Sequence, residues 1–79
     1  MSDLSLSPRQ ISCLEWVAAG KTSWEIACIL RITERTVNFH LHHAYRRLGV
    51  HTRAAAVACA IGQGLVNMST VTEQRPAGR

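Results

Sequence analysis

The side chains best suited to chemistry in this sequence lie between Glu34 and Leu48, and they favour hydrogen bonding over catalysis. If this segment is a helix, about 100° of rotation per residue separates an apolar stripe from an opposite face. That opposite face carries amide, aromatic, imidazole and guanidinium groups: Asn38, Phe39, His42, His43 and Arg46. In the major groove of DNA, arginine can donate two hydrogen bonds to guanine, asparagine can bond adenine twice, and an apolar group can contact the thymine methyl. We therefore expect these residues to contact bases.

Phe39 and the histidines of this segment allow other interpretations. A large aromatic side chain far from the core needs a partner, which is DNA, a neighbouring loop or a second protein chain. His40, His42 and His43 could suggest a metal site, but no carboxylate or cysteine lies beside them. We therefore expect no metal. His40 borders the apolar stripe and is expected to be half-buried and hydrogen-bonded.

Positive charge is concentrated in one part of the chain. The net charge is +4, and no acidic residue occurs from Arg35 to Thr72. A basic surface suits a polyanion such as double-stranded DNA, although a solvated face without a partner would look the same. We expect phosphate contacts from basic side chains and from helix starts, where backbone N–H groups point outward. The residues expected to contact phosphates are Lys21, Thr22, Ser23, Thr33, Arg35, Thr36, Arg47 and Arg53.

Composition argues against several classes of protein. A chain of 79 residues supports one core. It has no apolar run near the ~20 residues that span a bilayer and no signal peptide, so we expect a cytoplasmic protein without a membrane partner. An enzyme is not expected, because there is no carboxylate pair, metal cluster or glycine-rich phosphate loop, and we expect no cofactor and no small-molecule ligand. The cysteines Cys13, Cys28 and Cys59 lie in apolar runs and are expected to be reduced core residues.

Four helices are expected to position these side chains. Capping boxes start the first two: Ser7 with Gln10, and Thr22 with Glu25. Threonine hydroxyls before the third and fourth helices can cap them. Left-handed glycines are expected to end three of the helices, at Gly20, Gly49 and Gly64. The predicted helices run from 8 to 19, from 23 to about 30, from 34 to 48 and over 52–63, with Leu65 and Val66 folding back.

The second and third helices are joined by three residues, which is typical of a helix-turn-helix. No strand-like alternation and no repeat is present, so the predicted fold class is all-α. Residues 1–66 are expected to form one domain, and residues 67–79 to be a disordered tail because they lack periodicity. The core-facing stripe of the third helix is predicted to be Val37, Leu41, Ala44 and Leu48.

Small residues cover nearly every side of the fourth helix. Val57, Ala60 and Ile61 can face the core, which leaves a smooth surface made of Ala54, Ala55 and Ala58. A second copy of the chain could approach this surface closely, so we expect a homodimer through it. The alternative is that these alanines are present only for their high helix propensity.

The sequence resembles the LuxR-type helix-turn-helix family, also called GerE-like. The resemblance covers residues 6–66 and lies in the motifs LSPR (6–9), GKTSWEIA (20–27), TVNFHL (36–41) and RLGV (47–50). Trp16 and the segment KTSWEI (21–26) look most like the quorum-sensing branch. It implies a four-helix transcription-factor domain that dimerises through its last helix and binds an inverted repeat. The residues that match the family's DNA-contacting helix are Asn38, Phe39, His42, His43 and Arg46.

The sequence departs from the family pattern in three ways. Gln10 and Ser12 stand where the family usually has Glu, which affects a supporting ion pair rather than DNA contact. Arg31 occupies a turn position usually given to Gly, where a left-handed conformation would cost roughly 1 kcal/mol. The chain has no room for the sensory domain that usually precedes this module. It is therefore either a stand-alone regulator or a fragment, and the competing function is an interaction module that forms heterodimers with full-length LuxR-type regulators.

Overall fold

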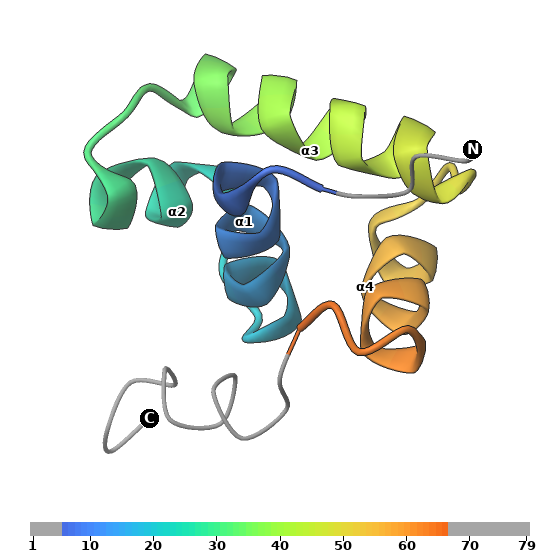
Figure 1. Ribbon diagram of the computed structural model, residues 1–79. Helices are drawn as coiled ribbons and strands as arrows, with labels where there is room; N and C mark the ends of the chain where they lie inside the picture. Colours follow the sequence, from blue (N-terminus) through green and yellow to red (C-terminus); the bar gives the residue numbers. More distant parts are fainter. Residues whose placement is uncertain (1–5, 67–79) are drawn as a thin grey trace.

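The computed structural model describes residues 6–66, which form four helices and no strand. Their bounds are α1 (Pro8–Ala18), α2 (Ser23–Leu30), α3 (Glu34–Leu48) and α4 (Arg53–Gly62). In Figure 1, α3 crosses the top of the molecule, with α2 beneath its beginning, α4 beneath its end and α1 between them. The predicted all-α class is confirmed for the described residues, and the tail predicted for 67–79 lies outside them.

Side-chain caps set the start of every helix. In the first capping box, Ser7 Oγ accepts from the backbone N–H of Gln10 at 3.1 Å, and Gln10 Oε1 accepts from the backbone N–H of Ser7 at 2.9 Å. The hydroxyls of Thr33 and Thr52 each accept the N–H three residues later, at 3.0 Å. Each cap contributes about 1 kcal/mol, because it satisfies a helix N–H that has no partner within the helix. The predicted helix starts are confirmed.

The helix ends agree with the sequence to within a residue. Gly49 follows α3 in the left-handed region with φ 71°. α4 ends at Gly62, one residue before the predicted end, and Gly64 follows it with φ 73°. The N–H of Leu65 then donates to the carbonyl of Ala60 at 2.8 Å, which turns the chain back toward the core. The predicted return at this end of the domain is confirmed.

Arg31 forms the corner between α2 and α3 in a conformation that side chains disfavour. Its φ of 60° and ψ of 45° are left-handed, and it is the one residue other than glycine with positive φ among residues 6–66. The N–H of Arg31 and that of Ile32 both donate to the carbonyl of Ala27. These bonds hold the tight turn at a cost of roughly 1 kcal/mol relative to glycine.

The core lies beneath α3. Its largest fully buried side chains are Cys13, Leu14, Ile26, Val37 and Leu41. Val37, Leu41 and Ala44 face the core as predicted, and Leu48 packs at its edge. α3 is therefore held from below by α1 and α2, which leaves its upper face to solvent.

The core side of α4 differs from the prediction. Ala56 and Ala60 are its fully buried residues, whereas Val57 and Ile61 are only partly buried. The fully buried positions of α4 are therefore occupied by alanine methyl groups, and the larger Val57 and Ile61 pack against the core from beside them. Ala54 and Ala58 are exposed as expected, and Ala55 is half-buried.

The prediction that all three cysteines are core residues is wrong for two of them. Cys13 is buried and Cys59 is half-buried, but Cys28 is exposed. Ile26 and Ala27 form the core face of α2, and Cys28 lies on its outer side. The sequence did not distinguish these faces because apolar residues occur on most sides of this helix. Burial raises the pKa of the Cys13 thiol, which Arg9 partly offsets, so this thiol stays protonated. No helix within residues 6–66 is long and apolar enough to cross a membrane.

Candidate nucleic-acid interface

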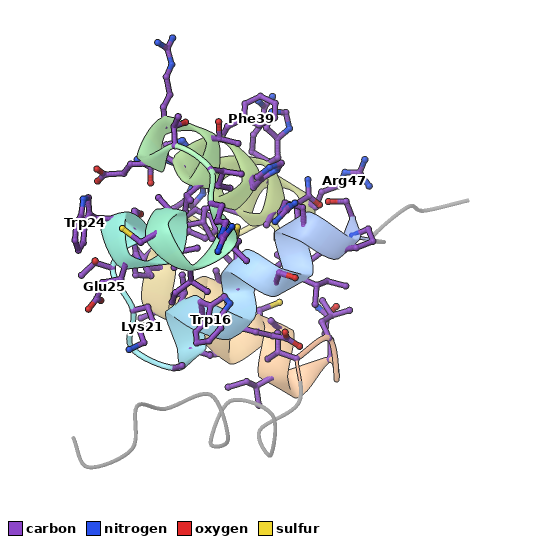
Figure 2. All side chains as sticks on the ribbon, turned by 90° about the vertical axis from the view of Figure 1, so that its left-hand side faces the viewer. Trp16, Lys21, Trp24, Glu25, Phe39 and Arg47 are labelled. Atoms are coloured by element: carbon purple, nitrogen blue, oxygen red, sulfur yellow. The ribbon has the colours of Figure 1, made fainter. Side chains whose placement is uncertain are left out.

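Four of the five side chains predicted to contact bases are exposed on the outer face of α3. Phe39 is 59% exposed, and His42, His43 and Arg46 are also exposed. Figure 2 shows Phe39 projecting from the top of α3, away from the other helices. The fifth, Asn38, is half-buried. A long exposed helix with one polar, basic and aromatic face has the shape and the hydrogen-bond donors that a DNA major groove admits.

Aromatic rings lie close together along this face, in tilted and edge-to-face arrangements. The ring centroids of Phe39 and His43 are 4.4 Å apart, and those of Phe39 and His40 are 5.7 Å apart. Both histidines belong to α3 itself, so the structure gives no support to the alternative that Phe39 packs against a neighbouring loop. Burial, followed by the charges of Arg9 and His43, holds the pKa of His40 below its ordinary value. His40 is half-buried, as predicted.

Asn38 is held by residues from two other helices. Ser23 Oγ donates to Asn38 Oδ1 at 2.8 Å, and Arg53 Nη2 donates to Ser23 Oγ at 3.1 Å. Arg53 Nη1 also donates to the backbone carbonyl of Lys21 at 3.4 Å. The Ser23 side chain is buried, with 8% of the residue exposed. These hydrogen bonds connect the start of α4 to the start of α2 and to Asn38 on α3.

These contacts change the interpretation of three residues expected to contact phosphates. The Ser23 hydroxyl and the exposed Arg53 guanidinium hydrogen-bond to other groups of the protein, and Lys21 is half-buried. Sequence reasoning missed this arrangement because the partners are 15 and 30 residues apart, and no periodicity relates such positions. Their contact with phosphate stays a prediction.

The backbone N–H of Thr22 does not point outward as expected. It donates to the carboxylate of Glu25 at 2.8 Å, which completes the capping box. That bond is the main reason why the pKa of Glu25 is lowered, so the carboxylate is charged at neutral pH. In Figure 2, Lys21 and Glu25 lie together low on the molecule, far below Phe39. This helix start is less open to a phosphate than the sequence suggested.

The remaining residues expected to contact phosphates lie on or beside α3. Thr33 Oγ1 donates to Thr36 Oγ1 at 2.8 Å and accepts the N–H of Thr36, so both hydroxyls act as caps. Arg35 is exposed near the beginning of the helix, and Arg47 is exposed near its end. The two arginines are well separated along the 15-residue helix, so they could contact phosphates at different places along a groove.

The two tryptophans of the chain lie in different environments. Trp16 is half-buried and packs against the core. Trp24 is 63% exposed, and Figure 2 shows it pointing outward from α2. Trp24 therefore does not cover the core.

An open apolar groove of about 580 Å³ lies between α1 and α4. Its lining residues are small or aliphatic except for one arginine: Val17, Ala18, Arg53, Ala54, Val57, Ala58 and Ile61. Ala54 and Ala58 belong to the surface predicted for dimerisation, whereas Ala55 does not line the groove. No group of three metal-binding side chains occurs within the part of the chain that the structure describes.

A family model described as "Bacterial regulatory proteins, luxR family" matches residues 4–60. The chain belongs to the LuxR family. Among curated LuxR-family relatives, the quorum sensing-dependent transcriptional regulator RpaR of Rhodopseudomonas palustris is 54% identical over 63 residues, covering 80% of this chain and 26% of that protein. The transcriptional activator AhyR of Aeromonas hydrophila is 48% identical over 62 residues, covering 78% and 24%. The chain thus spans about a quarter of the length of these relatives.

Three solved structures share the fold of this chain. Escherichia coli SdiA matches with a TM-score of 0.76 at 36% identity, over 85% of this chain and 28% of that chain. The response regulator ChrA of a heme-sensing two-component system gives 0.76 at 40% identity, over 78% and 31%. The transcription factor GerE gives 0.77 over 84% of this chain and 97% of that one, and at 24% identity it supports the fold alone. The chain is a helix-turn-helix domain of a transcriptional regulator.

Proposed function

We propose that this domain binds a specific double-stranded DNA site as a homodimer, with α3 in the major groove. The observation that carries the proposal is the division of α3 into a buried apolar face and an exposed face of groove-reading side chains. Membership of a regulator family with this helix-turn-helix supports DNA as the partner.

Base contacts are assigned to the outer face of α3: Asn38, Phe39, His42, His43 and Arg46. Arg46 is the strongest candidate for sequence discrimination, because a guanidinium can donate two hydrogen bonds to one guanine. Phe39 is largely exposed and can contact a thymine methyl. Arg35 and Arg47 are assigned to phosphates, which fix the position of the helix in the groove.

Homodimerisation is assigned to the α1–α4 groove. Ala54 and Ala58 let a second helix approach closely, and Val57 and Ile61 offer partly exposed apolar surface beside them. Two copies related by a two-fold axis would place two α3 helices on an inverted repeat. Homodimerisation is thus assigned to a surface separate from the outer face of α3.

We propose a role in quorum sensing for the regulator to which this domain corresponds, and not for the domain alone. RpaR is described as quorum sensing-dependent, and the match covers 26% of its length.

Selection of binding sites from random duplexes tests the proposal. We expect an inverted repeat with half-sites about one helical turn apart, bound by two copies of the chain as measured by mass in solution. If each protomer neutralises ~4 to 6 phosphates, the affinity should fall with salt with a log–log slope of ~4 to 5 per protomer. A pool that yields no enriched sequence, or an affinity that does not change with salt, would rule out specific DNA binding.

A further inference from the structure

Three helices meet in one chain of hydrogen bonds that the DNA-binding proposal does not require. Arg53 at the start of α4 donates to Ser23 at the start of α2, and Ser23 donates to Asn38 on α3, at 3.1 and 2.8 Å. A second bond from Arg53 to the carbonyl of Lys21, at 3.4 Å, steadies the guanidinium. The middle residue is 8% exposed, so water has little access to its hydroxyl.

The chemistry of the three groups fixes the direction of this chain. A guanidinium can only donate, so Ser23 Oγ accepts from Arg53. The one hydroxyl hydrogen of Ser23 is then left for Asn38, and it needs an acceptor, which is Oδ1. A reversed Asn38 amide would leave that hydrogen without a partner in a buried position, which is unfavourable. The positive charge of Arg53 further polarises the hydroxyl and strengthens its bond to Oδ1.

We propose that Arg53 and Ser23 are positioning residues that hold the Asn38 side-chain amide in one orientation, with Oδ1 toward the protein and Nδ2 available to DNA. This inference rests on the proposed function of α3. Asn38 then meets a base mainly as a hydrogen-bond donor. Guanine, which has two adjacent acceptors in the major groove, is favoured opposite it, and cytosine, which presents a donor there, is disfavoured. The double bond to adenine expected from the sequence is weakened, because Oδ1 is already shared with Ser23.

Ser23 is the better residue for testing this idea than Arg53. Arg53 also lines the groove assigned to dimerisation, so a change there could act through the second copy. Ser23 does not line that groove. Ser23→Ala removes the donor to Asn38, and Ser23→Thr keeps a hydroxyl. Arg9→Gln removes one exposed positive charge from α1, and Arg9 takes part in none of the hydrogen bonds that join Arg53, Ser23 and Asn38, so it is the matched control for Arg53→Gln.

The first test is the NMR spectrum of the ¹⁵N-labelled protein without DNA. The Asn38 side-chain amide pair is assigned by its disappearance in Asn38→Ala. In Ser23→Ala we expect the chemical shifts of this pair to change and rotation about the side-chain amide bond, which exchanges its two hydrogens, to become faster. Backbone chemical shifts remote from residue 23 should stay unchanged. Ser23→Thr should restore the original behaviour, and Arg9→Gln should leave it unchanged. An Asn38 pair that is unaltered in folded Ser23→Ala overturns the proposal.

The second test is base preference. Asn38→Ala identifies the base pair that Asn38 reads, as the position where the preference of the selected site is lost. At that position the wild-type chain should prefer guanine to cytosine, and Ser23→Ala and Arg53→Gln should reduce the preference by about fivefold, the size of one hydrogen bond. Arg9→Gln should not alter the preference. Full preference in Ser23→Ala, a preference for cytosine, or no position that depends on Asn38 overturns the proposal. If the wild-type chain selects no duplex, the function of α3 fails instead, and the NMR test alone decides the orientation of Asn38.

Discussion

α3 and α4 differ in how sharply they separate their faces. α3 has Val37 and Leu41 buried beneath it and Phe39 and Arg46 exposed above it. α4 is small and apolar on most sides, and its buried contacts are made by alanines while its larger residues line an open groove. The mixed polarity of α3 lets the sequence predict which face is buried, whereas in the alanine-rich α4 packing against the other helices decides it.

The largest expected loss of stability comes from a substitution on the core face of α3. Leu41→Ala should lower the free energy of unfolding by about 2–5 kcal/mol, because Leu41 is 2% exposed and its loss leaves a cavity. Val57→Ala in the groove of α4 should cost only about 1 kcal/mol, because Val57 is partly exposed. Urea unfolding followed by circular dichroism measures both values. Equal losses in the two variants would contradict the contrast between the helices.

The groove of α4 is tested by adding charge to it. Ala58→Glu should leave the fold intact but reduce binding to the inverted repeat by tenfold or more, because two like charges would face each other across a two-fold interface. Gln63→Glu adds the same charge just beyond α4, outside the groove, and should have little effect. DNA titration and mass in solution report the result. A dimer that survives Ala58→Glu would place the interface elsewhere.

A substitution at the corner between α2 and α3 should raise the stability of the domain instead of lowering it. Arg31→Gly relieves the left-handed strain and makes the unfolded chain more flexible, so the net gain in stability should be about 0.5 kcal/mol. Thermal unfolding should show a midpoint about 2–4 °C higher. A lower midpoint would show that the Arg31 side chain makes a stabilising contact.

The smallest expected effect concerns pH. Because the folded state holds the pKa of His40 below its ordinary value, the unfolded chain binds the proton more readily. Stability is therefore complete above about pH 6.5 and declines slightly as the pH falls through the window below it. His40→Gln should lessen that decline in unfolding measurements at pH 7 and pH 5.5.

Much of the fold was predictable because its signals are local. Ser7 and Thr22 each act with a residue three positions later, and Gly49 acts at its own position, so helix bounds follow from short stretches of sequence. The exposed face of α3 was predictable for the same reason. Phe39 and Arg46 are about two helical turns apart, so the helical repeat places them on the same face.

The rest depended on contacts between distant residues. The inward bonds of Ser23 and Arg53 need three helices in place before they exist. The exposure of Cys28 could not be inferred either. Apolar residues occur on nearly all sides of α2, so its packing against the other helices decides which side is buried. Local chemistry therefore predicts which residues could face DNA, and tertiary packing decides which of them remain free to do so.

The most direct test of the central claim is the affinity of Arg46→Ala for the selected duplex and for a scrambled duplex of equal length. If the outer face of α3 reads bases, the variant should lose about tenfold to a hundredfold on the selected duplex and much less on the scrambled one. Equal losses on both duplexes would show that Arg46 contacts only phosphates. No loss on either duplex would contradict the assignment of this face of α3 to DNA.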